Sequence, residues 1–364
     1  MIDLRYFLTV LSKATSFLSK VGSYSEETKR LLRQRVLTMA KIVLGLGTSH
    51  SPMLSTPAEI WHLHADRDQK NNALEFRGRS YNYEDLKQSR AREKLEQHLG
   101  NEIWQSKQAS CQQAIMALSK KLSEVSPDVV VIIGDDQHEL FYEDGMPAFA
   151  IFWGERIQCI PPDEPVHSSI AAARRDQFGD EPEWYAVESD LGKHMVVQMM
   201  AEGFDVAQLT RQANGRTVGH AFTFVRRRII QPKMFPILPV TINTYFPPNQ
   251  PTAARCYAFG KALRRAIESW DSTKRVAVVA SGGLSHFVVD EEFDQGVLKA
   301  MKENDEKAIG SFGEPLFQSG SSEIKNWITA AGALEHLNME LLNYAPAYRS
   351  EAGTGCGLAF AQWR

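Results

Sequence analysis

The stretch Lys41-Ile-Val-Leu-Gly-Leu-Gly-Thr-Ser-His50-Ser-Pro-Met-Leu54 decides the expected fold. Its apolar run predicts a buried strand that stops after a glycine and presents His50 at its carboxyl end. Pro52 lacks the N–H needed to continue a strand ladder, so the chain turns away there. A strand that is apolar on both faces suits the middle of a parallel sheet, and ligands bind beyond the carboxyl ends of such strands. We therefore expect His50 to anchor the active site.

Similar strand-like runs recur along the chain, and most are followed by a segment of helical period. The runs lie at Lys41 to Gly47, Val129 to Gly134, Ala148 to Trp153, Ile237 to Ile242 and Val276 to Ser281. The helical segments lie at about 101 to 125, 190 to 202, 252 to 270 and 294 to 309. This alternation predicts an α/β fold with a mostly parallel or mixed central sheet, helices on both faces, and the active site at the strand carboxyl ends.

The domain organisation follows from length and from the absence of a linker. The chain has 364 residues and is 43% hydrophobic, which is enough for a sizeable core. No Gly-, Ser- or Pro-rich linker divides it, so residues 39 to 364 are expected to form a single catalytic domain. Residues 1 to 38 contain two amphipathic pieces and are expected to form a helical N-terminal extension. The polar stretch between residues 54 and 91 lacks periodicity and is predicted to be an irregular lid or wall over the site.

Composition restricts the classes of partner. The formal net charge is -3, from 41 basic and 44 acidic residues spread along the chain, so we expect no nucleic-acid partner. No apolar run approaches the ~18 to 20 residues that span a bilayer, so we expect no membrane segment. The four cysteines are isolated and fit buried roles in a reducing, cytoplasmic compartment. The expected partner is a small molecule.

Three of the ten histidines follow predicted strands: His50, His138 and His286. The carboxyl ends of parallel strands meet at one rim, so these imidazoles are expected to converge although they lie far apart in sequence. Two histidines and one carboxylate on one face of an octahedron describe the non-haem Fe(II) oxygenases. Spacing alone does not choose the carboxylate, and the candidates are Asp135, Asp136, Glu139 and Glu323.

Six ordered segments resemble the LigB-type (class III) extradiol ring-cleavage dioxygenases. They are Gly47-Thr-Ser-His50, Asp135-Asp-Gln-His138, Val218-Gly-His220, Pro239-Val-Thr-Ile-Asn-Thr-Tyr-Phe-Pro-Pro248, Ser281-Gly-Gly-Leu-Ser-His286 and Ser322-Glu-Ile-Lys-Asn-Trp327. The resemblance runs from about residue 41 to 363 and does not cover residues 1 to 38. One departure is Gln137, which lies between the aspartate and the histidine where the family has the two side by side.

The resemblance implies a role for each matched residue. His50, His138 and Glu323 would be the metal ligands, and Fe(II) would be the cofactor. His286 would be the acid-base histidine, and His220 would be a second active-site histidine that contacts substrate or oxygen. Some members have a small helical partner, for which the sequence shows no counterpart after Arg364; together with the N-terminal arm, this makes a homodimer our expectation.

The implied reaction inserts both atoms of O2 into a catechol-type ring, protocatechuate-like or gallate-like, and opens it. A catechol that binds Fe(II) through both oxygens must lose a proton, and a histidine with a pKa near ~6.5 can accept it at neutral pH. Two alternatives stay open: a non-catalytic binding module on the same scaffold, and a zinc hydrolase with the same ligands. Arg67, Arg77 or Arg79 could pair a substrate carboxylate, although surface salt bridges are the expected use of arginines in such a stretch.

Overall fold

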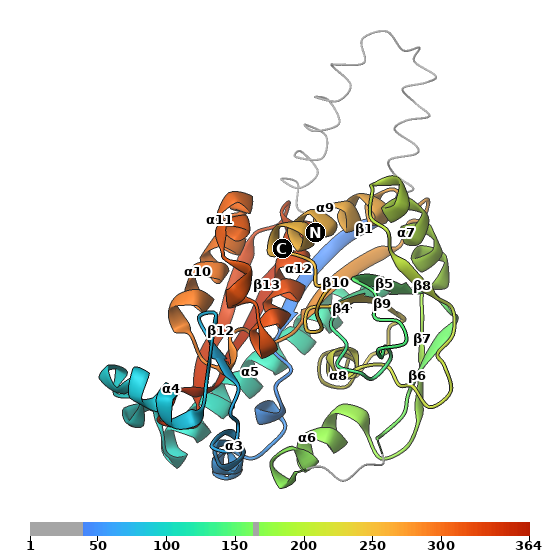
Figure 1. Cartoon of the computed structure of the whole chain (residues 1–364). Helices are drawn as coiled ribbons and strands as arrows, with labels where there is room; N and C mark the ends of the chain where they lie inside the picture. Colours follow the sequence, from blue (N-terminus) through green and yellow to red (C-terminus); the bar gives the residue numbers. More distant parts are fainter. Residues whose placement is uncertain (1–38, 163–166) are drawn as a thin grey trace, which may run out of the picture.

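The computed structural model describes residues 39–162 and 167–364, so the predicted N-terminal extension lies outside the described residues. A mixed nine-stranded sheet forms the centre of the molecule, with the strand order β11-β13-β1-β10-β4-β9-β5-β8 and β12 paired to β13 (Figure 1). Four strands run parallel at its middle: β1 (Lys41–Thr48), β10 (Arg275–Ser281), β4 (Val129–Gly134) and β9 (Ile237–Ile242). The prediction of an α/β fold with a mixed central sheet is confirmed.

Strands of opposite direction flank this parallel centre. On one side β5 (Phe149–Phe152) runs antiparallel to β9 and is followed by the parallel β8 (Ala207–Leu209). On the other side β13 (Thr354–Trp363) runs antiparallel to β1. Both β12 (Met339–Tyr348) and the short β11 (His286–Val288) pair with β13. A separate two-stranded sheet joins β6 (Arg156–Cys159) to β7 (Glu183–Ala186).

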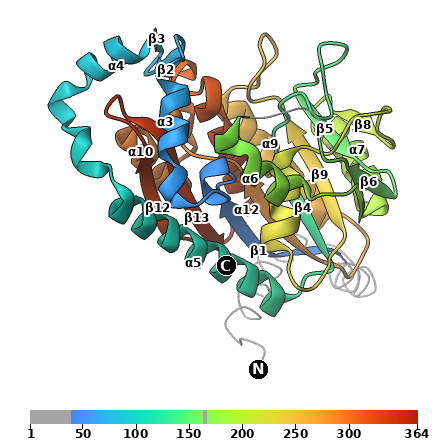
Figure 2. The same cartoon turned by 90° about the horizontal axis from the view of Figure 1, so that it is seen from below.

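Helices cover both faces of the central sheet. The longest, α5 (Asn101–Val125), lies on the face opposite α9 (Ala253–Glu268) and α12 (Ile324–Leu334), as Figure 2 shows. The pair α9 and α12 approach closely because glycines occupy their contact: a Cβ at Gly260 would lie 1.9 Å from the Thr329 carbonyl oxygen, and one at Gly332 would lie 2.2 Å from that of Tyr257. Further helices are α6 (Ser168–Phe178), α7 (Ser189–Ala201), α8 (His220–Phe224), α10 (Glu291–Lys302) and α11 (Glu306–Ser311).

Two expectations about local structure need correction. The single helix predicted over 294 to 309 is two helices, because Asn304 adopts a left-handed backbone and the Asp305 side chain caps a new helix start. The stretch between 54 and 91 is more regular than predicted. It contains α3 (His62–Asp68), a hairpin of β2 (Leu74–Phe76) and β3 (Arg79–Tyr81), and α4 (Tyr83–Ser89). Within the described ranges, no helix is both long and apolar enough to cross a membrane.

Candidate active site

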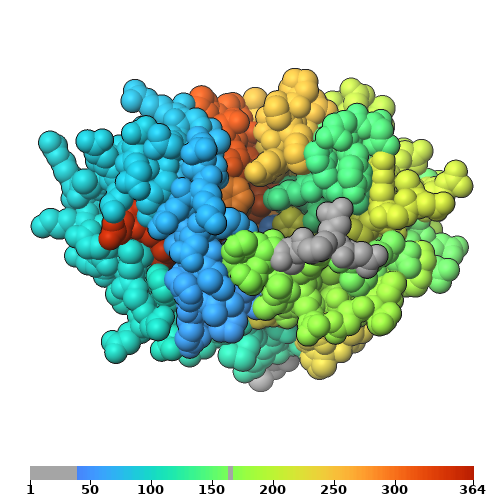
Figure 3. Space-filling view, turned by 60° about the horizontal axis from the view of Figure 1, so that its bottom comes forward, coloured from blue at the N-terminus to red at the C-terminus, as the bar shows by residue number. Residues whose placement is uncertain are grey.

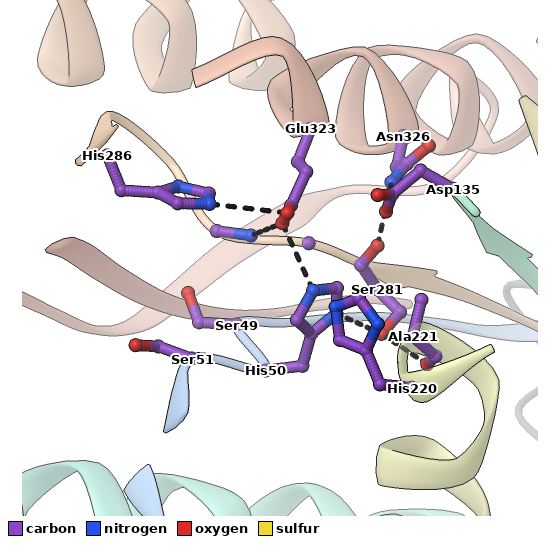
Figure 4. Close-up of polar contacts among 12 residues, drawn as sticks. Ser49, His50, Ser51, Asp135, His220, Ala221, Ser281, His286, Glu323 and Asn326 are labelled. Carbon is purple, nitrogen blue, oxygen red and sulfur yellow. Dashed lines mark hydrogen bonds and ion pairs between the residues drawn. The ribbon is translucent and has the colours of Figure 1, made fainter. Parts of the chain in front are cut away.

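Side chains from distant parts of the sequence meet just beyond the carboxyl ends of β1, β4 and β10 (Figure 4). The parallel ladder of β1 and β10 has one register shift, between Ile42 and Leu44, and then pairs Leu44 with Ala277 through to Thr48 with Ser281, which brings these ends level. A 3-10 turn (Ser319–Glu323) leads into α12, and a Gly219 turn leads into α8. The polar residues delivered here are His50, Gln137, His220, Ser281 and Glu323. This rim is where the sequence predicted the site.

A cavity of about 530 Å³ opens at this rim, within the range of roughly 300–1,000 Å³ usual for small-molecule sites. Figure 3 looks toward this end of the molecule and shows a hollow between the blue segment that contains α3 and the orange C-terminal half. One part of the lining comes from the segments that meet at the strand ends, with His50, His220, His286 and Glu323, and another part comes from α3 and the turn after it. Both parts therefore face the same space.

His50 presents a free nitrogen to this cavity. The Ser281 hydroxyl donates to the Ala221 carbonyl oxygen at 2.6 Å, so its oxygen is left to accept from Nδ1 of His50 at 3.0 Å. The proton of the neutral imidazole is thereby placed on Nδ1. Nε2 of His50 is buried and has no hydrogen-bond partner, although it lies 3.1 Å from Oε2 of Glu323. A buried, deprotonated imidazole nitrogen beside a carboxylate is the arrangement of a metal ligand.

Glu323 lies at the centre of the polar cluster and is 1% exposed. Its Oε2 accepts from the backbone N–H of Gly283 at 2.8 Å, and its Oε1 accepts from Nε2 of Gln137 at 3.0 Å. Burial alone would raise the pKa of this carboxyl, but the positive charge of His286 holds it well below its ordinary value. Glu323 therefore stays a carboxylate that can bind a cation.

His220 begins α8 and is held by Glu139. One oxygen of that carboxylate, Oε1, accepts from the backbone N–H of His220 at 3.0 Å and also contacts Nδ1 of the ring. Burial opposes the charged imidazole, yet the Glu139 carboxylate raises the pKa of His220 to about 10. The ring lies edge-on to His50 with centroids 4.6 Å apart. The Glu139 contact fixes Nδ1 and leaves Nε2 for another partner.

His286 also approaches the Glu323 carboxylate, from a different direction than His50 (Figure 4). Its Nδ1 donates to the Leu284 carbonyl oxygen at 2.8 Å, and its Nε2 is 3.2 Å from Oε1 of Glu323. Burial opposes its charged form, but Glu323 and then Cys356 raise the pKa of His286 well above the ordinary value. The ring lines the cavity, so His286 has one fixed nitrogen and one that faces the polar cluster.

The structure does not bring His138 to the cluster. Its backbone is left-handed, with φ of 63°, and its ring stacks on Phe246 at 3.9 Å and on Tyr142 at 5.5 Å between centroids. His138 is not among the residues that line the cavity. Gln137 does line the cavity and contacts Glu323. The insertion that Gln137 makes relative to the family pattern thus shifts the loop by one residue, so that the glutamine faces inward.

Two buried aspartates shape this loop. Asp136 accepts from the backbone N–H groups of Leu140 at 2.8 Å and Phe141 at 3.0 Å, which pins the chain after Gln137. Burial, followed by the nearby carboxylate of Glu139, raises the pKa of Asp136 to about 7. Burial and then Glu323 raise the pKa of Asp135, which accepts from Asn326 at 3.0 Å, to about 6. Both carboxyls act as supports for the loop and for the side chains that touch Glu323.

Several residues of the site were not identified from the sequence. Ser281, which orients His50, ends a predicted strand, and that position was the available signal. Glu139 was one of four carboxylate candidates, but its pairing with His220 depends on two segments that lie 81 residues apart. Gln137 was recognised as a departure from the family pattern, without a role. Arg67 was one of three arginines that could pair a substrate carboxylate, with a surface salt bridge as the expected use; it lines the cavity.

One group of side chains in the described part of the chain has the geometry to hold a metal ion: His50, His220 and Glu323, here called the triad. The ligand atoms that they offer lie within 4.8 Å of one another. Two imidazoles and one carboxylate are the donor set of non-haem iron enzymes. The unpartnered Nε2 of His50 and the ionised Glu323 fit a divalent cation.

Fold and site together define an α/β protein with a metal-binding triad at the carboxyl rim of its sheet. The model of the family described as the catalytic LigB subunit of aromatic ring-opening dioxygenase matches residues 97–355, which is well over half of the chain. The chain therefore belongs to the LigB family, as the sequence motifs predicted. Extradiol dioxygenases of this family are metal-dependent, in accord with the triad.

Curated relatives match over shorter lengths. A gallate dioxygenase of Pseudomonas putida is 37% identical over 102 residues, which is 27% of this chain and 28% of the relative. A 2,3-dihydroxyphenylpropionate/2,3-dihydroxicinnamic acid 1,2-dioxygenase of Paraburkholderia xenovorans is 26% identical over 170 residues, or 47% of this chain and 46% of the relative. The enzyme of the same name from Comamonas testosteroni is 24% identical over 51% of each chain. The matches thus span about half or less of these relatives.

Proposed function

We propose that this protein is an Fe(II)-dependent extradiol dioxygenase that inserts both atoms of O2 into a catechol-type ring and opens it. The observation that carries the proposal is the buried Nε2 of His50, which has no hydrogen-bond partner and lies 3.1 Å from Glu323. Family membership and relatives named for the cleavage of gallate and 2,3-dihydroxyphenylpropionate support it. A protocatechuate-like or gallate-like diol and O2 are the proposed substrates.

The triad of His50, His220 and Glu323 would hold the iron, and binding would displace the Nε2 proton that the raised pKa of His220 retains in the free protein. Bound Fe(II) supplies open coordination positions and one-electron chemistry that link a diol to O2. His220 thereby takes the ligand role that the family pattern assigned to His138. Ser281 and Glu139 fix Nδ1 of the two imidazoles, as the outer partners of metal-bound histidines commonly do. Glu323 is ionised and buried, so it supplies the negative charge of the ligand set.

His286 would move the proton of the diol. A cation bound by Glu323 would remove the negative charge that raises the pKa of His286, so that its Nε2 could lose its proton. Because Nδ1–H donates to the Leu284 carbonyl oxygen, Nε2 is then the nitrogen that accepts a proton from a diol hydroxyl and later returns it. The ring lines the cavity beside Glu323 and so reaches the space where a diol would lie. The backbone contact orients the ring before the substrate arrives.

Oxygen uptake tests the reaction. Purified protein is reconstituted with Fe(II) under anaerobic conditions and mixed with a panel of catechols in oxygenated buffer. We expect oxygen consumption and the absorbance of a ring-opened product with at least one diol. Stoichiometric iron with no oxygen uptake from any diol contradicts the proposal. A protein purified with zinc, whose metal gives no nitric oxide adduct, would favour a zinc hydrolase, and a folded protein that binds no metal would favour a binding module.

The ligand assignment has its own test, because two histidines compete for one role. Iron content and affinity are measured for the His220→Ala and His138→Ala variants. We expect His220→Ala to lose bound iron, and His138→Ala to keep it because its ring stacks on Phe246 outside the cavity. The reverse result would return His138 to the ligand set and show that the loop containing Gln137 rearranges when metal binds.

A further inference from the structure

The wall of the cavity contributed by α3 is cationic. Arg67, in the last turn of α3, and Lys70, in the turn that follows, both line the cavity that contains the triad. Arg67 is half-buried and Lys70 is exposed. The triad lies at the strand ends, so the cavity has a metal-binding region and a region with two positive charges. Together, Arg67 and Lys70 are here called the cationic wall.

The acid beside this wall does not neutralise it. Asp68 is 3% exposed and forms two hydrogen bonds with Arg349, from Nε at 2.5 Å and from Nη2 at 2.9 Å. That buried pair is balanced within itself. Across the described ranges, no ion pair and no side-chain hydrogen bond is formed by Arg67 or by Lys70. The cationic wall therefore carries charge that the protein leaves uncompensated.

The pKa shifts of Arg67 and His64 agree with the absence of an acid paired to the cationic wall. Burial, followed by the positive charge of Arg349, lowers the pKa of the Arg67 guanidinium, and the weaker effect of Asp68 in the opposite direction does not offset them. His64, one turn earlier on α3, adds no charge, because burial and Arg349 lower its pKa to about 3. A half-buried cation without a counter-ion is unfavourable, and an anionic ligand would relieve that cost.

Two other arginines of the same segment, Arg77 and Arg79, do not line the cavity as Arg67 does. Arg77 forms ion pairs with Asp290 at 2.6 Å and Glu292 at 2.7 Å. Arg79 is exposed on β3, and neither of these two arginines lines the cavity. The expectation of surface salt bridges thus holds for Arg77. Of the three candidates raised by the sequence, Arg67 is the arginine that faces the cavity.

We propose that the cationic wall is a subsite for the anionic substituent of the substrate, so that the enzyme selects diols bearing a carboxylate over neutral diols of the same size. The inference rests on the proposed function, because the diol end is taken to lie at the triad and His286. A planar guanidinium pairs a carboxylate with two parallel hydrogen bonds, which are stronger than neutral ones. Arg67 supplies that geometry, and Lys70 supplies a second positive charge.

Matched kinetics test the subsite. The ratio of kcat/KM for a carboxylated catechol to that for its amide is measured in the wild type and in the Arg67→Gln, Arg67→Lys and Arg79→Gln variants. We expect Arg67→Gln to lower the ratio roughly 10- to 100-fold, as the loss of a charge-assisted pair implies. Arg67→Lys should restore part of the ratio, and Arg79→Gln should leave it unchanged. An unchanged ratio in Arg67→Gln overturns the subsite.

Equilibrium binding separates failure of the subsite from failure of the proposed function. Calorimetry compares 4-hydroxybenzoate with 4-hydroxybenzamide, two monophenols that lack the second hydroxyl of a diol, on anaerobic iron-loaded enzyme. The wild type should prefer the carboxylate, the preference should weaken with added salt, and it should disappear in Arg67→Gln. Equal affinities in the wild type overturn the subsite even if diols are cleaved. A carboxylate preference that depends on Arg67 supports the subsite even if no diol consumes oxygen.

Discussion

Ser281 fixes the protonation of His50: its oxygen accepts from Nδ1 at 3.0 Å because its own proton is donated to the Ala221 carbonyl oxygen at 2.6 Å. The relationship joins three parts of the fold, since His50 follows β1, Ser281 ends β10 and Ala221 lies in α8. The same α8 carries His220, so the position of one proposed ligand and the tautomer of the other depend on one hydroxyl group. The parallel register of β1 and β10, which pairs Thr48 with Ser281, places that hydroxyl beside the ring.

Removal of this hydroxyl should weaken metal binding. The Ser281→Ala variant leaves Nδ1 of His50 without its acceptor, so the tautomer with a free Nε2 loses its advantage. We expect iron affinity to fall about 10- to 100-fold, the usual effect of an outer-shell partner of a metal-bound histidine. Competition with a chelator measures the change, and Ser311→Ala, at an exposed serine of α11, is the control. Unaltered affinity in Ser281→Ala would show that the hydroxyl does not set the tautomer.

Substitution of His286 should separate proton transfer from metal binding. In His286→Phe the ring volume is retained, but Nε2, the proposed proton acceptor, is lost. We expect iron to remain bound at wild-type stoichiometry while kcat falls about 10²- to 10⁴-fold, the range for loss of an acid-base group. Iron analysis and oxygen uptake on the same preparation measure both quantities. If iron is lost together with turnover, His286 is a ligand, and the triad is assigned wrongly.

The contact between α9 and α12 predicts a large effect from one methyl group. A Cβ at Gly332 would meet the Tyr257 carbonyl oxygen at 2.2 Å, and backbone atoms cannot move aside as a flexible side chain would. We expect Gly332→Ala to lower the free energy of unfolding by about 1–3 kcal/mol or more. At the helical Gly310 a Cβ would lie 3.5 Å from that of Ala254, an ordinary contact, so Gly310→Ala should stabilise by up to ~1 kcal/mol. Urea denaturation of both variants checks the pair, and equal effects would refute the argument.

The central strands were predictable because they are continuous apolar runs. The strands β1, β4, β9 and β10 lie within a residue or two of their predicted positions, since burial on both faces leaves a strong pattern. The hairpin of β12 and β13 was not predicted. In β13, from Thr354 to Trp363, two glycines and two alanines give little strand preference, and Pro346 interrupts the pattern of β12. Pairing with β1 and with each other, which is a tertiary effect, makes these segments strands.

The site was predictable only where strand ends determine it. Strand ends indicated His50, His138 and His286, of which the structure places the first and the last in the cavity lining. Family resemblance alone selected Glu323 from four carboxylates and pointed to His220. The choice between Gln137 and His138 depends on a one-residue shift in a loop. That shift is determined by the hydrogen bonds of Asp136 to the following backbone and by the stacking of His138 on Phe246, contacts that join separate segments and leave no periodic pattern.

A buried carboxyl that contacts Ser285 predicts a pH dependence of stability. Asp294 is fully buried and contacts the backbone N–H of Ser285 at 2.8 Å, the hydroxyl of Ser285 at 2.8 Å and that of Tyr344 at 2.7 Å. Burial, partly offset by these hydrogen bonds, raises its pKa from 3.8 to about 7. The folded protein therefore keeps a proton on Asp294 between about pH 4 and pH 7 that the unfolded chain releases. The stability contributed by this proton is complete below pH 4 and is lost as the pH rises through 7.

The Asp294→Asn variant tests the direction of this pH dependence. An amide has the shape of the protonated acid and does not titrate, so the variant should match the wild type near pH 4 and become more stable than it by pH 8. The difference in unfolding free energy should grow by roughly 1 kcal/mol per pH unit across the window, as one linked proton requires. Urea denaturation at intervals from pH 4 to 8 measures the unfolding free energy of both proteins. Other buried groups that titrate, such as Asp136, are present in both, so their effect cancels in the difference. Asp271→Asn, at an exposed aspartate, is the control and should show no such trend. A difference between Asp294→Asn and the wild type that is flat with pH would mean that Asp294 is ionised in the folded protein and that Ser285 and Tyr344 stabilise its carboxylate.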